Sequence, residues 1–186
     1  MIVFVVTRNR EALALLMACV ALIPAGSASA DERWKPIPPG TTIETGDTWI
    51  ADGLRYRLYG VQSCLRGTTF TTVSGSRHDC GDASLAMLAA LIRDLKPVCA
   101  VVRQAAEGAI RHAVCTAILQ RNGKTERLDL GTAMIATGFA FASLGHDGKP
   151  VHSGYGAAEQ EAEMARAGLW ATGAFQHPAK VLRGNP

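Results

Sequence analysis

The chain has 186 residues, a formal net charge of +3 and an apolar fraction of 48%. This is the composition of an ordinary folded domain, long enough for one real core and too short for two comfortable ones. The charge alone does not indicate a nucleic-acid binder, because such proteins usually show a clustered basic face and a higher isoelectric point.

Residues 1–30 have the pattern of a secretory signal peptide. Arg8 and Arg10 precede the apolar run 12–26, and Ala28-Ser29-Ala30 is a small-x-small cleavage site. Cleavage near Ala30 would leave a mature chain without a stable membrane span. The sequence therefore predicts a bacterial protein that is periplasmic or secreted.

Two other interpretations of the N-terminus fit less well. A membrane anchor would need a longer apolar run than this one, which Pro24 interrupts. Lipidation at Cys19 is a minor alternative, because the apolar run continues past this cysteine.

Removal of residues 1–30 leaves four cysteines, Cys64, Cys80, Cys99 and Cys115. An even number in an oxidising compartment favours two disulfides. A zinc site is less favoured, since no two of them have the C-x-x-C spacing.

A β-rich region follows a Pro-rich, extended lead-in at residues 31–40. Two strand-like runs, 41–51 and 54–61, flank Asp52-Gly53, which predicts a tight hairpin. In the second run, apolar Tyr56 and Leu58 alternate with Arg55 and Arg57. Both arginines therefore lie on one face of the predicted strand.

Residues 66–78 are rich in Gly, Ser and Thr and predict a surface loop. Residues 79–95 predict a helix, because leucine and isoleucine recur at helical spacing and Asp79 or Asp82 can cap its start.

Residues 97–104 and 109–120 predict two strands around the turn at Glu107. Cys99 and Cys115 are equidistant from that turn, so an antiparallel register would place them opposite each other. This leaves Cys64 and Cys80 to connect the third strand with the first helix.

The C-terminal third predicts further short elements. These are a turn at Asn122-Gly123, a helix over 128–138, a strand at 139–143, and an amphipathic helix from Tyr155 to Ala167 that Gly168 ends. Residues 173–186 lack periodicity and predict a loose tail. The whole pattern indicates a mainly β, α+β domain over 41–172, a small closed barrel of the OB type with five strands and three helices.

Several segments, in this order, resemble the thermonuclease (staphylococcal-nuclease-like) family. They are Gly46-Asp47-Thr48, "YRLYGV" at 56–61, "CGDASLAMLAALI" at 80–92, "IRHAVC" at 110–115, "LDLGTAMIATGFAFA" at 128–142, and the Tyr155-to-Trp170 helix. The resemblance spans residues 41–171 and implies a five-stranded OB barrel with three helices. It also implies a phosphodiesterase that cleaves DNA and RNA with one calcium ion.

The resemblance assigns a role to each site position. Asp47 matches a metal-binding aspartate, and Arg57 matches the first arginine that clamps the phosphate. The family's next metal carboxylate falls at Gln62, and a carbonyl ligand falls at Ser63. A second aspartate, usual two residues before the first, is Thr45 here.

Two more positions decide what chemistry remains. The catalytic glutamate falls at Leu65, while the second arginine matches Arg111, with Glu107 at the place of the family's aspartate. Residues 53–78 contain no Asp or Glu, so no shifted alignment restores the missing acids. Loss of a positioned base costs about 10²–10⁴ in rate. We therefore expect ordinary calcium-dependent nuclease activity to be absent or very weak.

Each candidate residue also has a simpler interpretation. Asp47 is equally consistent with a turn residue, and both arginines with surface ion pairs. His78 and His112 are possible replacement bases, but isolated histidines are more often structural. Asp79 and Asp82 are more typical of helix caps than of relocated metal ligands.

Three functions remain open at this point. The first is a non-catalytic module in which Arg57 and Arg111 bind phosphate, nucleotide, nucleic acid or another polyanion, with no cofactor. The second is an active secreted phosphodiesterase whose rearranged calcium site recruits Asp79 or Asp82. The third is a structural or accessory barrel, of a kind also associated with bacterial exopolysaccharide production.

Overall fold

The computed structural model describes residues 33–104, 110–172 and 175–184. The predicted signal peptide lies outside these residues. The strands are β1 Lys35–Pro36, β2 Thr42–Thr45, β3 Thr48–Ala51, β4 Leu54–Leu58, β5 Val61–Ser63, β6 Thr69–Thr71, β7 Arg77–Asp79, β8 Val98–Gln104, β9 Arg111–Arg121, β10 Lys124–Asp129 and β11 Ala140–Ala142. The helices are α1 Cys80–Leu95, α2 Leu130–Ala136, α3 Ser153–Met164 and α4 Pro178–Leu182, and a 3₁₀ turn spans Gly168–Trp170.

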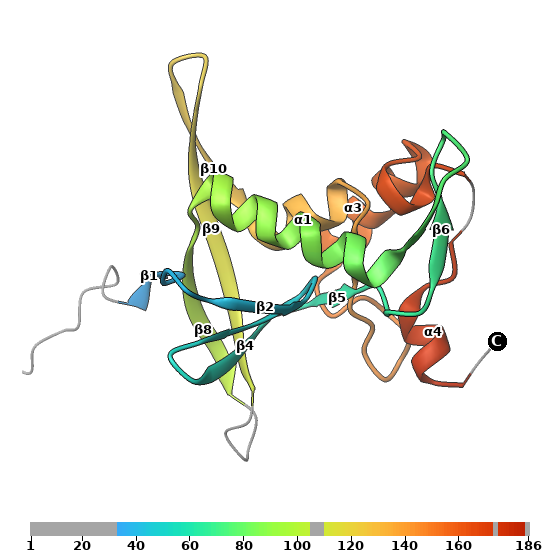
Figure 1. Cartoon of the computed structure of the whole chain (residues 1–186). Coiled ribbons are helices and arrows are strands. Elements are labelled where there is room, and N and C mark those ends of the chain that lie inside the picture. Colours follow the sequence, from blue (N-terminus) through green and yellow to red (C-terminus); the bar gives the residue numbers. More distant parts are fainter. Residues whose placement is uncertain (1–32, 105–109, 173–174, 185–186) are drawn as a thin grey trace, which may run out of the picture.

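The main sheet has seven strands and curls into a half-barrel (Figure 1). Its order is β1-β8-β9-β4-β3-β2, with β10 also paired to β9. Most neighbours are antiparallel, whereas β4 and β9 run parallel. The prediction of a mixed α+β fold is confirmed, but the described strands leave the sheet open between β1 and β2 rather than closing a five-stranded barrel.

The Asp52-Gly53 hairpin forms as the sequence predicts. Ala51 pairs with Leu54, so the turn has two residues, and both adopt positive φ, 50° at Asp52 and 71° at Gly53. These dihedrals match the twist of an antiparallel pair, which explains the preference for Asp-Gly at this position. The hairpin fixes which residues of β4 face the core.

Helix α1 crosses one side of the curled sheet (Figure 1). The Asp79 carboxylate caps it by accepting from the Asp82 N–H at 2.9 Å, as the sequence predicted. Leu88 of α1 is fully buried together with Trp49, Leu58 and Met134 in the main core. Burial of this apolar stripe, rather than intrinsic propensity, holds the helix on the sheet.

Both predicted disulfides are present. Cys99 and Cys115 are direct register partners on β8 and β9 and form one bond. The other joins Cys64, after β5, to Cys80 at the first position of α1. Two disulfides are consistent with an oxidising compartment.

Two segments differ from the prediction. The polar stretch 66–78 contains the hairpin β6–β7, because Phe70 turns toward a second core while its threonine neighbours face outward. The C-terminal stretch, expected to be loose, includes α4. Its His177 accepts from the Ala179 N–H at the start of this helix, and Phe175 stacks near Phe141.

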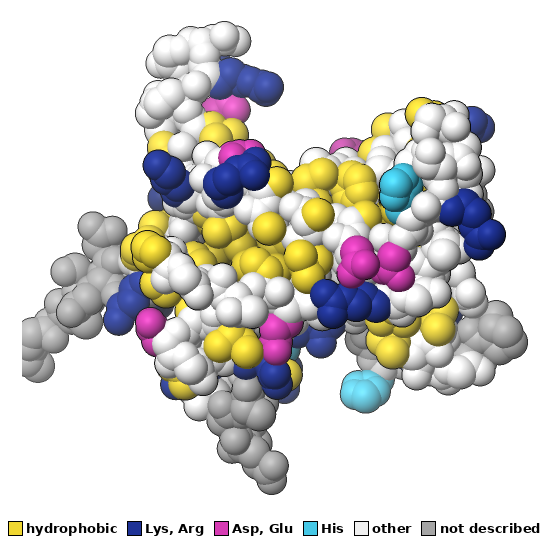
Figure 2. Space-filling view, viewed as in Figure 1, with side chains coloured by type: hydrophobic (Ala, Val, Ile, Leu, Met, Phe, Trp, Pro, Cys, Tyr) yellow, Lys and Arg dark blue, Asp and Glu magenta, His cyan; other side chains and the backbone are white. Residues whose placement is uncertain are grey.

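The second core joins α3 and the C-terminal segment to the rest of the molecule. Phe141 lies edge-on to Trp170, with ring centroids 5.5 Å apart, and both side chains are buried. On the surface, Figure 2 shows hydrophobic side chains gathered over α1, with charged groups at the edges of this face. None of the described helices is both long and apolar enough to cross a membrane.

Candidate functional site

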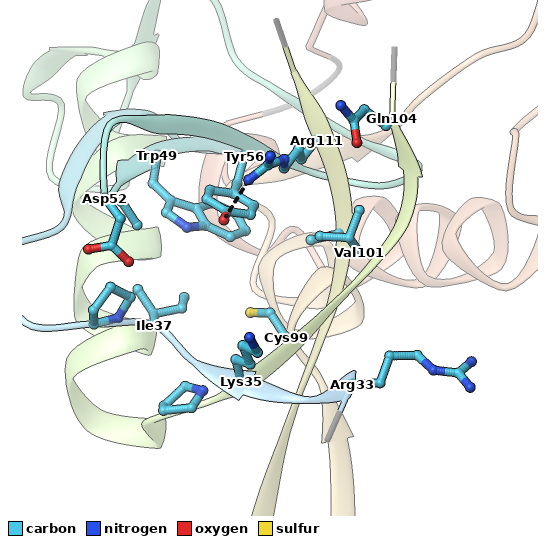
Figure 3. A pocket seen from close by; sticks show the side chains of 14 residues that line it. Arg33, Lys35, Ile37, Trp49, Asp52, Tyr56, Cys99, Val101, Gln104 and Arg111 are labelled. Atoms are coloured by element: carbon cyan, nitrogen blue, oxygen red, sulfur yellow. Dashed lines mark hydrogen bonds between the residues drawn. The ribbon is translucent and has the colours of Figure 1, made fainter. Parts of the chain in front are cut away.

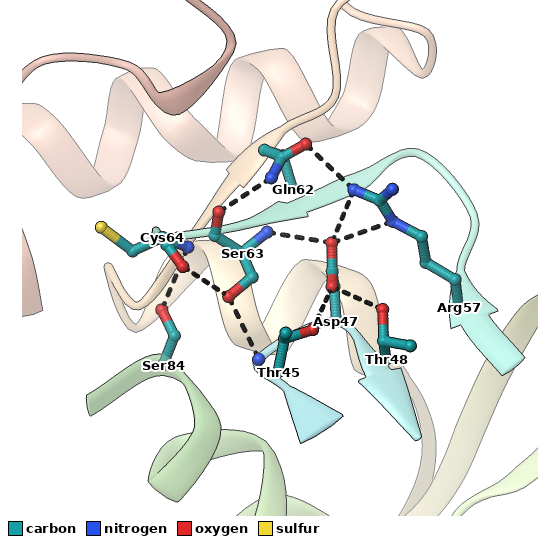
Figure 4. A network of polar contacts seen from close by, with 9 residues as sticks. Thr45, Asp47, Thr48, Arg57, Gln62, Ser63, Cys64 and Ser84 are labelled. Carbon is teal, nitrogen blue, oxygen red and sulfur yellow. Dashed lines mark hydrogen bonds and ion pairs between the residues drawn. The ribbon is translucent and has the colours of Figure 1, made fainter. Parts of the chain in front are cut away.

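The structure brings four of the predicted site residues together. Asp47 follows Gly46 in the turn between β2 and β3, Arg57 lies on β4, and Gln62 and Ser63 lie on β5. Figure 4 shows the Asp47 carboxylate meeting the Arg57 side chain and the Ser63 backbone N–H, with Gln62 on the other side of Arg57. The segments that carry them are adjacent because β3 pairs with β4 and the Leu58 N–H donates to the Asp47 carbonyl at 2.8 Å.

Gly46 permits this arrangement by its lack of a side chain. A Cβ atom at Gly46 would lie 2.5 Å from the Cβ of Ser84 on α1. The Gly46 N–H donates to Ser63 Oγ at 3.1 Å, and the Ser84 hydroxyl bridges the Cys64 N–H and the Phe139 carbonyl. The Gly-Asp turn is therefore packed directly against the helix and held in one position.

The Asp47 carboxylate is buried and fully occupied by donors. Thr45 Oγ1 and Thr48 Oγ1 donate to Oδ1 at 2.6 and 2.8 Å. On Oδ2, the Ser63 N–H lies at 3.1 Å, and the Arg57 Nε and Nη2 atoms lie at 3.0 and 2.9 Å. A carboxylate offers about four lone-pair sites, so these five contacts leave none for another ligand.

Gln62 completes this network on its other side. Its Oε1 accepts from Arg57 Nη2 at 2.9 Å, and its Nε2 donates to the Ser63 carbonyl at 3.0 Å. The amide thus fills the position of the missing carboxylate with a neutral hydrogen-bond partner. It also ties the Ser63 carbonyl, the expected oxygen ligand, into a bond within the protein.

This donor set does not fit calcium. Calcium takes 6–8 oxygen ligands, with carboxylates supplying the affinity, and here the single carboxylate of Asp47 is surrounded by hydrogen-bond donors and by Arg57. Across the described ranges, no group of three His, Cys, Asp or Glu side chains is placed to hold a metal ion. We derive no catalytic step through a metal at this site.

A cavity of about 280 Å³ opens beside the network. Its wall includes Arg57, Gln62, Leu65, Arg66 and Gly81. Leu65, where the resemblance leads one to expect a catalytic glutamate, gives this wall an apolar side chain that neither accepts a proton nor orients water. The guanidinium groups of Arg57 and Arg66 make the cavity an anion-favouring one.

Arg66 is a site residue that the sequence reasoning missed. Its loop is held against the start of α1 by the Cys64–Cys80 disulfide, and its Nε donates to Asp82 Oδ1 at 3.0 Å. A Cβ on Gly81 would lie 2.5 Å from the Arg66 backbone nitrogen, so this approach also needs the glycine. The predicted Cys64–Cys80 disulfide could have identified Arg66 as a site residue, because it places residue 66 at the start of α1.

Arg111 does not lie beside Arg57, and this corrects the prediction that the two arginines clamp one phosphate together. The parallel register of β4 and β9 places Arg111 beside Tyr56 and Arg57 beside His112. Residues paired across two strands share a face of the sheet, whereas successive residues of one strand alternate between faces. Arg111 therefore shares a face with Tyr56, and Arg57 points to the opposite face. The Arg111 guanidinium contacts the Tyr56 hydroxyl at 3.4 Å in a separate cavity.

His112 therefore occupies the position beside Arg57. Its ring lies edge-on to that of Tyr59, with centroids 6.3 Å apart. Partial burial, followed by the charges of Arg57 and Arg103, lowers the pKa of His112 and favours the neutral ring. It does not line the 280 Å³ cavity, so its position gives no support to a role as replacement base.

The other acidic candidates serve local structure. Asp79 caps α1 and accepts from the Gly67 N–H at 2.6 Å, and these hydrogen bonds lower the pKa of its carboxyl. Asp82 pairs with Arg66. His78 lies exposed on β7 near Phe70. Glu107 falls outside the described residues.

No family model matches the chain, and no curated protein matches it. The function is therefore argued from the residues and their geometry.

Proposed function

We propose that this protein is an exported thermonuclease-like domain that binds phosphate-bearing or other polyanionic ligands and does not cleave phosphodiesters with calcium. The observation that carries the proposal is the state of Asp47. Its carboxylate is neutralised by Arg57 and accepts hydrogen bonds from three further groups, the Thr45 and Thr48 hydroxyls and the Ser63 N–H. A site built in this way holds an arginine in place instead of a metal ion.

The sheet topology supports the inferred fold. The meander β2-β3-β4 continues through the parallel partner β9 to the antiparallel β8. Helix α1 is inserted between the meander and β8, as in the predicted order of elements. This arrangement is compatible with the partly open Greek-key barrel of the OB type, whose surfaces bind oligonucleotides and oligosaccharides.

The cavity charge supports the ligand class. Asp47 is the acidic residue in its lining, and its charge is balanced by Arg57, so Arg66 leaves a net positive wall. The Arg66 side chain is 60% exposed and its partner Asp82 is 68% exposed. An exposed pair of this kind contributes little and can exchange its carboxylate for a ligand oxyanion.

The start of α1 does not add to this site, although Gly81 lines the cavity. Asp79 accepts from the Asp82 N–H and so occupies the positive end of the helix with a carboxylate of the chain itself. Binding is therefore assigned to the guanidinium groups. Arg66 is the more accessible of the two, because the Arg57 side chain is only 31% exposed.

Anisotropy of a fluorescein-labelled oligothymidylate tests the proposal, with dextran sulfate as an unrelated polyanion. The Arg66→Ala variant should weaken binding and reduce its salt dependence, because one cation fewer neutralises the ligand. Arg55→Ala is the matched control. Arg55 lies on the same face of β4 as Arg57 but pairs with Glu44 at 2.6 Å outside the cavity, so its loss should change affinity little.

The same oligonucleotide, incubated with calcium, separates the alternatives. Calcium-dependent cleavage by the wild type, abolished by chelation, would overturn the proposal in favour of an active phosphodiesterase. Binding of neither oligothymidylate nor dextran sulfate would leave a structural or accessory barrel. Preference for the sulfated polysaccharide over DNA would point to the saccharide-linked variant.

A further inference from the structure

A second, larger cavity than the one beside Asp47 lies on the other face of the sheet. It has a volume of about 570 Å³, which is within the range of small-molecule sites. Strand β1 and the following prolines form one wall, and β3, β4, β8 and β9 form the others. Figure 3 shows Trp49 and Tyr56 on one side of this space and Ile37 and Val101 around its edge.

Tyr56 forms the accessible part of the aromatic wall of the cavity, and Trp49, which is only 2% exposed, lies behind it. The Trp49 and Tyr56 rings stack with centroids 5.7 Å apart and an interplanar angle of 11°. Ile37, Val101 and Ala113 add aliphatic contacts to the lining. Such a surface accepts a planar or alicyclic hydrocarbon body, because ring faces and side-chain methyl groups gain most by excluding water.

The charges around the cavity favour an anion. Arg33, Lys35 and Arg111 contribute three cations to the lining, and Asp52 contributes one carboxylate. In Figure 3 the Arg111 guanidinium lies beside Tyr56, close to the aromatic pair, whereas Arg33 lies at the outer edge. The cation best placed to meet a ligand held against the rings is therefore Arg111.

Among the described residues, Arg111 has few hydrogen-bond partners. The side chain is half-buried, and within the described residues its hydrogen bonding consists of one contact of 3.4 Å to the Tyr56 hydroxyl. Its Cζ lies 5.9 Å from the Tyr56 ring centroid. A guanidinium carries five N–H donors, and a partly buried charge with few partners is costly. A carboxylate in the cavity would supply the missing acceptors.

We infer that this cavity binds a small organic monoanion with a planar apolar body, an arene carboxylate or a close analogue. The body lies against Tyr56, which Trp49 supports from behind, and the carboxylate accepts from Arg111. This inference does not rest on the proposed polyanion site, which uses Arg57 and Arg66 on the opposite face.

Calorimetric titration with 2-naphthoate, and with the uncharged 2-naphthamide, tests the inference on protein with both disulfides formed. The wild type should bind the carboxylate more tightly than the amide. Arg111→Met should weaken 2-naphthoate binding about tenfold to a hundredfold, the loss of one charge-assisted hydrogen-bond pair, and leave 2-naphthamide unchanged. Arg121→Met is the matched control, since Arg121 is exposed at the far end of the same strand.

A second pair of variants tests the location without touching the charge. Val101 and Val102 are adjacent on β8 and both exposed, at 44% and 51%, but only Val101 lines the cavity. Val101→Trp should fill the space and abolish binding of both compounds, while Val102→Trp should not.

Equal affinity of Arg111→Met and Arg121→Met for 2-naphthoate would overturn the inference. So would equal effects of the two tryptophan substitutions, or failure of the wild type to bind either compound at millimolar concentration. If Arg111→Met does not fold cooperatively in a urea titration, Lys35→Met replaces it. Lys35 is an exposed cation of the same lining, and its loss should weaken 2-naphthoate binding severalfold.

Discussion

Asp47, which the sequence resemblance matches to a metal-binding aspartate, is a structural residue in this fold. Here the carboxylate joins the β2–β3 turn to β4 and β5, through Thr45, Thr48, Arg57 and Ser63. Its role in the structure is that of a buried ion pair with a complete hydrogen-bond shell.

Asp47→Asn should therefore destabilise the protein strongly. The variant leaves Arg57 without its counter-charge, and the new amide N–H₂ faces donors. Removing one partner of a buried ion pair costs about 3–5 kcal/mol. Because Arg57 is partly exposed, we expect the variant to lose about 3 kcal/mol of unfolding free energy. Urea unfolding measures it.

Glu44→Gln is the control for this prediction. It breaks the Arg55–Glu44 ion pair, in which the Arg55 side chain is 47% exposed, and should change the unfolding free energy far less, because exposed ion pairs contribute little to stability. A loss in Asp47→Asn that does not exceed that of the control would show that the Asp47 network is not structural.

At the scale of elements, the Cys64–Cys80 disulfide connects β5 to α1 and carries the Arg66 loop with it. Both disulfides join cysteines 16 positions apart, so they should stabilise the fold by similar amounts through the unfolded state. They differ in what they position, because Cys99–Cys115 joins β8 to β9 and neither of these cysteines lines the 280 Å³ cavity.

Double alanine substitution of Cys64 and Cys80 should cost about 3 kcal/mol in unfolding free energy and also weaken polyanion binding. Substitution of Cys99 and Cys115 should cost a similar amount and leave polyanion binding unchanged. Urea unfolding and oligothymidylate anisotropy give the two readouts. Equal loss of polyanion affinity in both double variants would contradict a specific role for the Arg66 loop.

Helix α4 is docked by a histidine that must stay neutral. His177 Nε2 lies 3.0 Å from the Ala142 carbonyl, and Nδ1 accepts from the Ala179 N–H at 3.1 Å. Burial lowers the pKa of His177, and Lys180 and Arg183 lower it further. Nearby Glu159 has a raised pKa, first through burial, while it accepts from the Ala142 N–H at 2.6 Å.

Stability should therefore fall as the pH drops below about 6.5, the ordinary histidine pKa. Between that pH and the lowered pKa of His177 in the folded state, this histidine is protonated in the unfolded chain but neutral in the folded protein. The raised pKa of Glu159 acts in the opposite direction, since the folded state takes up that proton first as the pH falls toward 4.5. A His177→Gln variant removes the first effect and leaves the second.

Urea midpoints of the wild type and His177→Gln between pH 7.5 and 5.5 measure the difference. The wild type should lose more stability over this range than the variant. His146→Gln, which removes an exposed ring, should follow the wild type. A parallel decline in the wild type and His177→Gln would rule out the α4 histidine as the cause.

At the scale of the whole molecule, the curled sheet separates two basic cavities. One holds Arg57 and Arg66 beside the α1 start, and the other holds Arg111 with Trp49 and Tyr56. The proposed ligands also differ, one a polyanion and the other a small apolar monoanion. The two sites share no lining residue, and they should therefore act independently.

In the Arg66→Ala/Arg111→Met double variant, each ligand should show only the effect of its own substitution. The change in binding free energy should match the corresponding single variant within about 0.5 kcal/mol, because distant sites with no shared partner are additive. The oligothymidylate and 2-naphthoate titrations check this. A larger coupling energy would indicate that the sheet transmits a change between the two faces.

Much of the local structure could be predicted from the sequence. The Asp52-Gly53 hairpin, the Asp79 cap of α1 and the register of Cys99 with Cys115 depend on residues close together in the chain or symmetric about one turn. The tail failed as a prediction because α4 has no periodicity of its own and is held by contacts of His177 and Phe175 with Phe141.

The sequence by itself determined what the Asp47 site lacks. Residues 53–78 contain no acid, and a carboxylate that is not in the chain cannot be supplied by any fold of that segment. Only the tertiary structure decided which arginines lie at the same site. The register of β4 with β9 pairs residues more than fifty positions apart, and a shift of one residue would exchange the faces of Arg111 and His112.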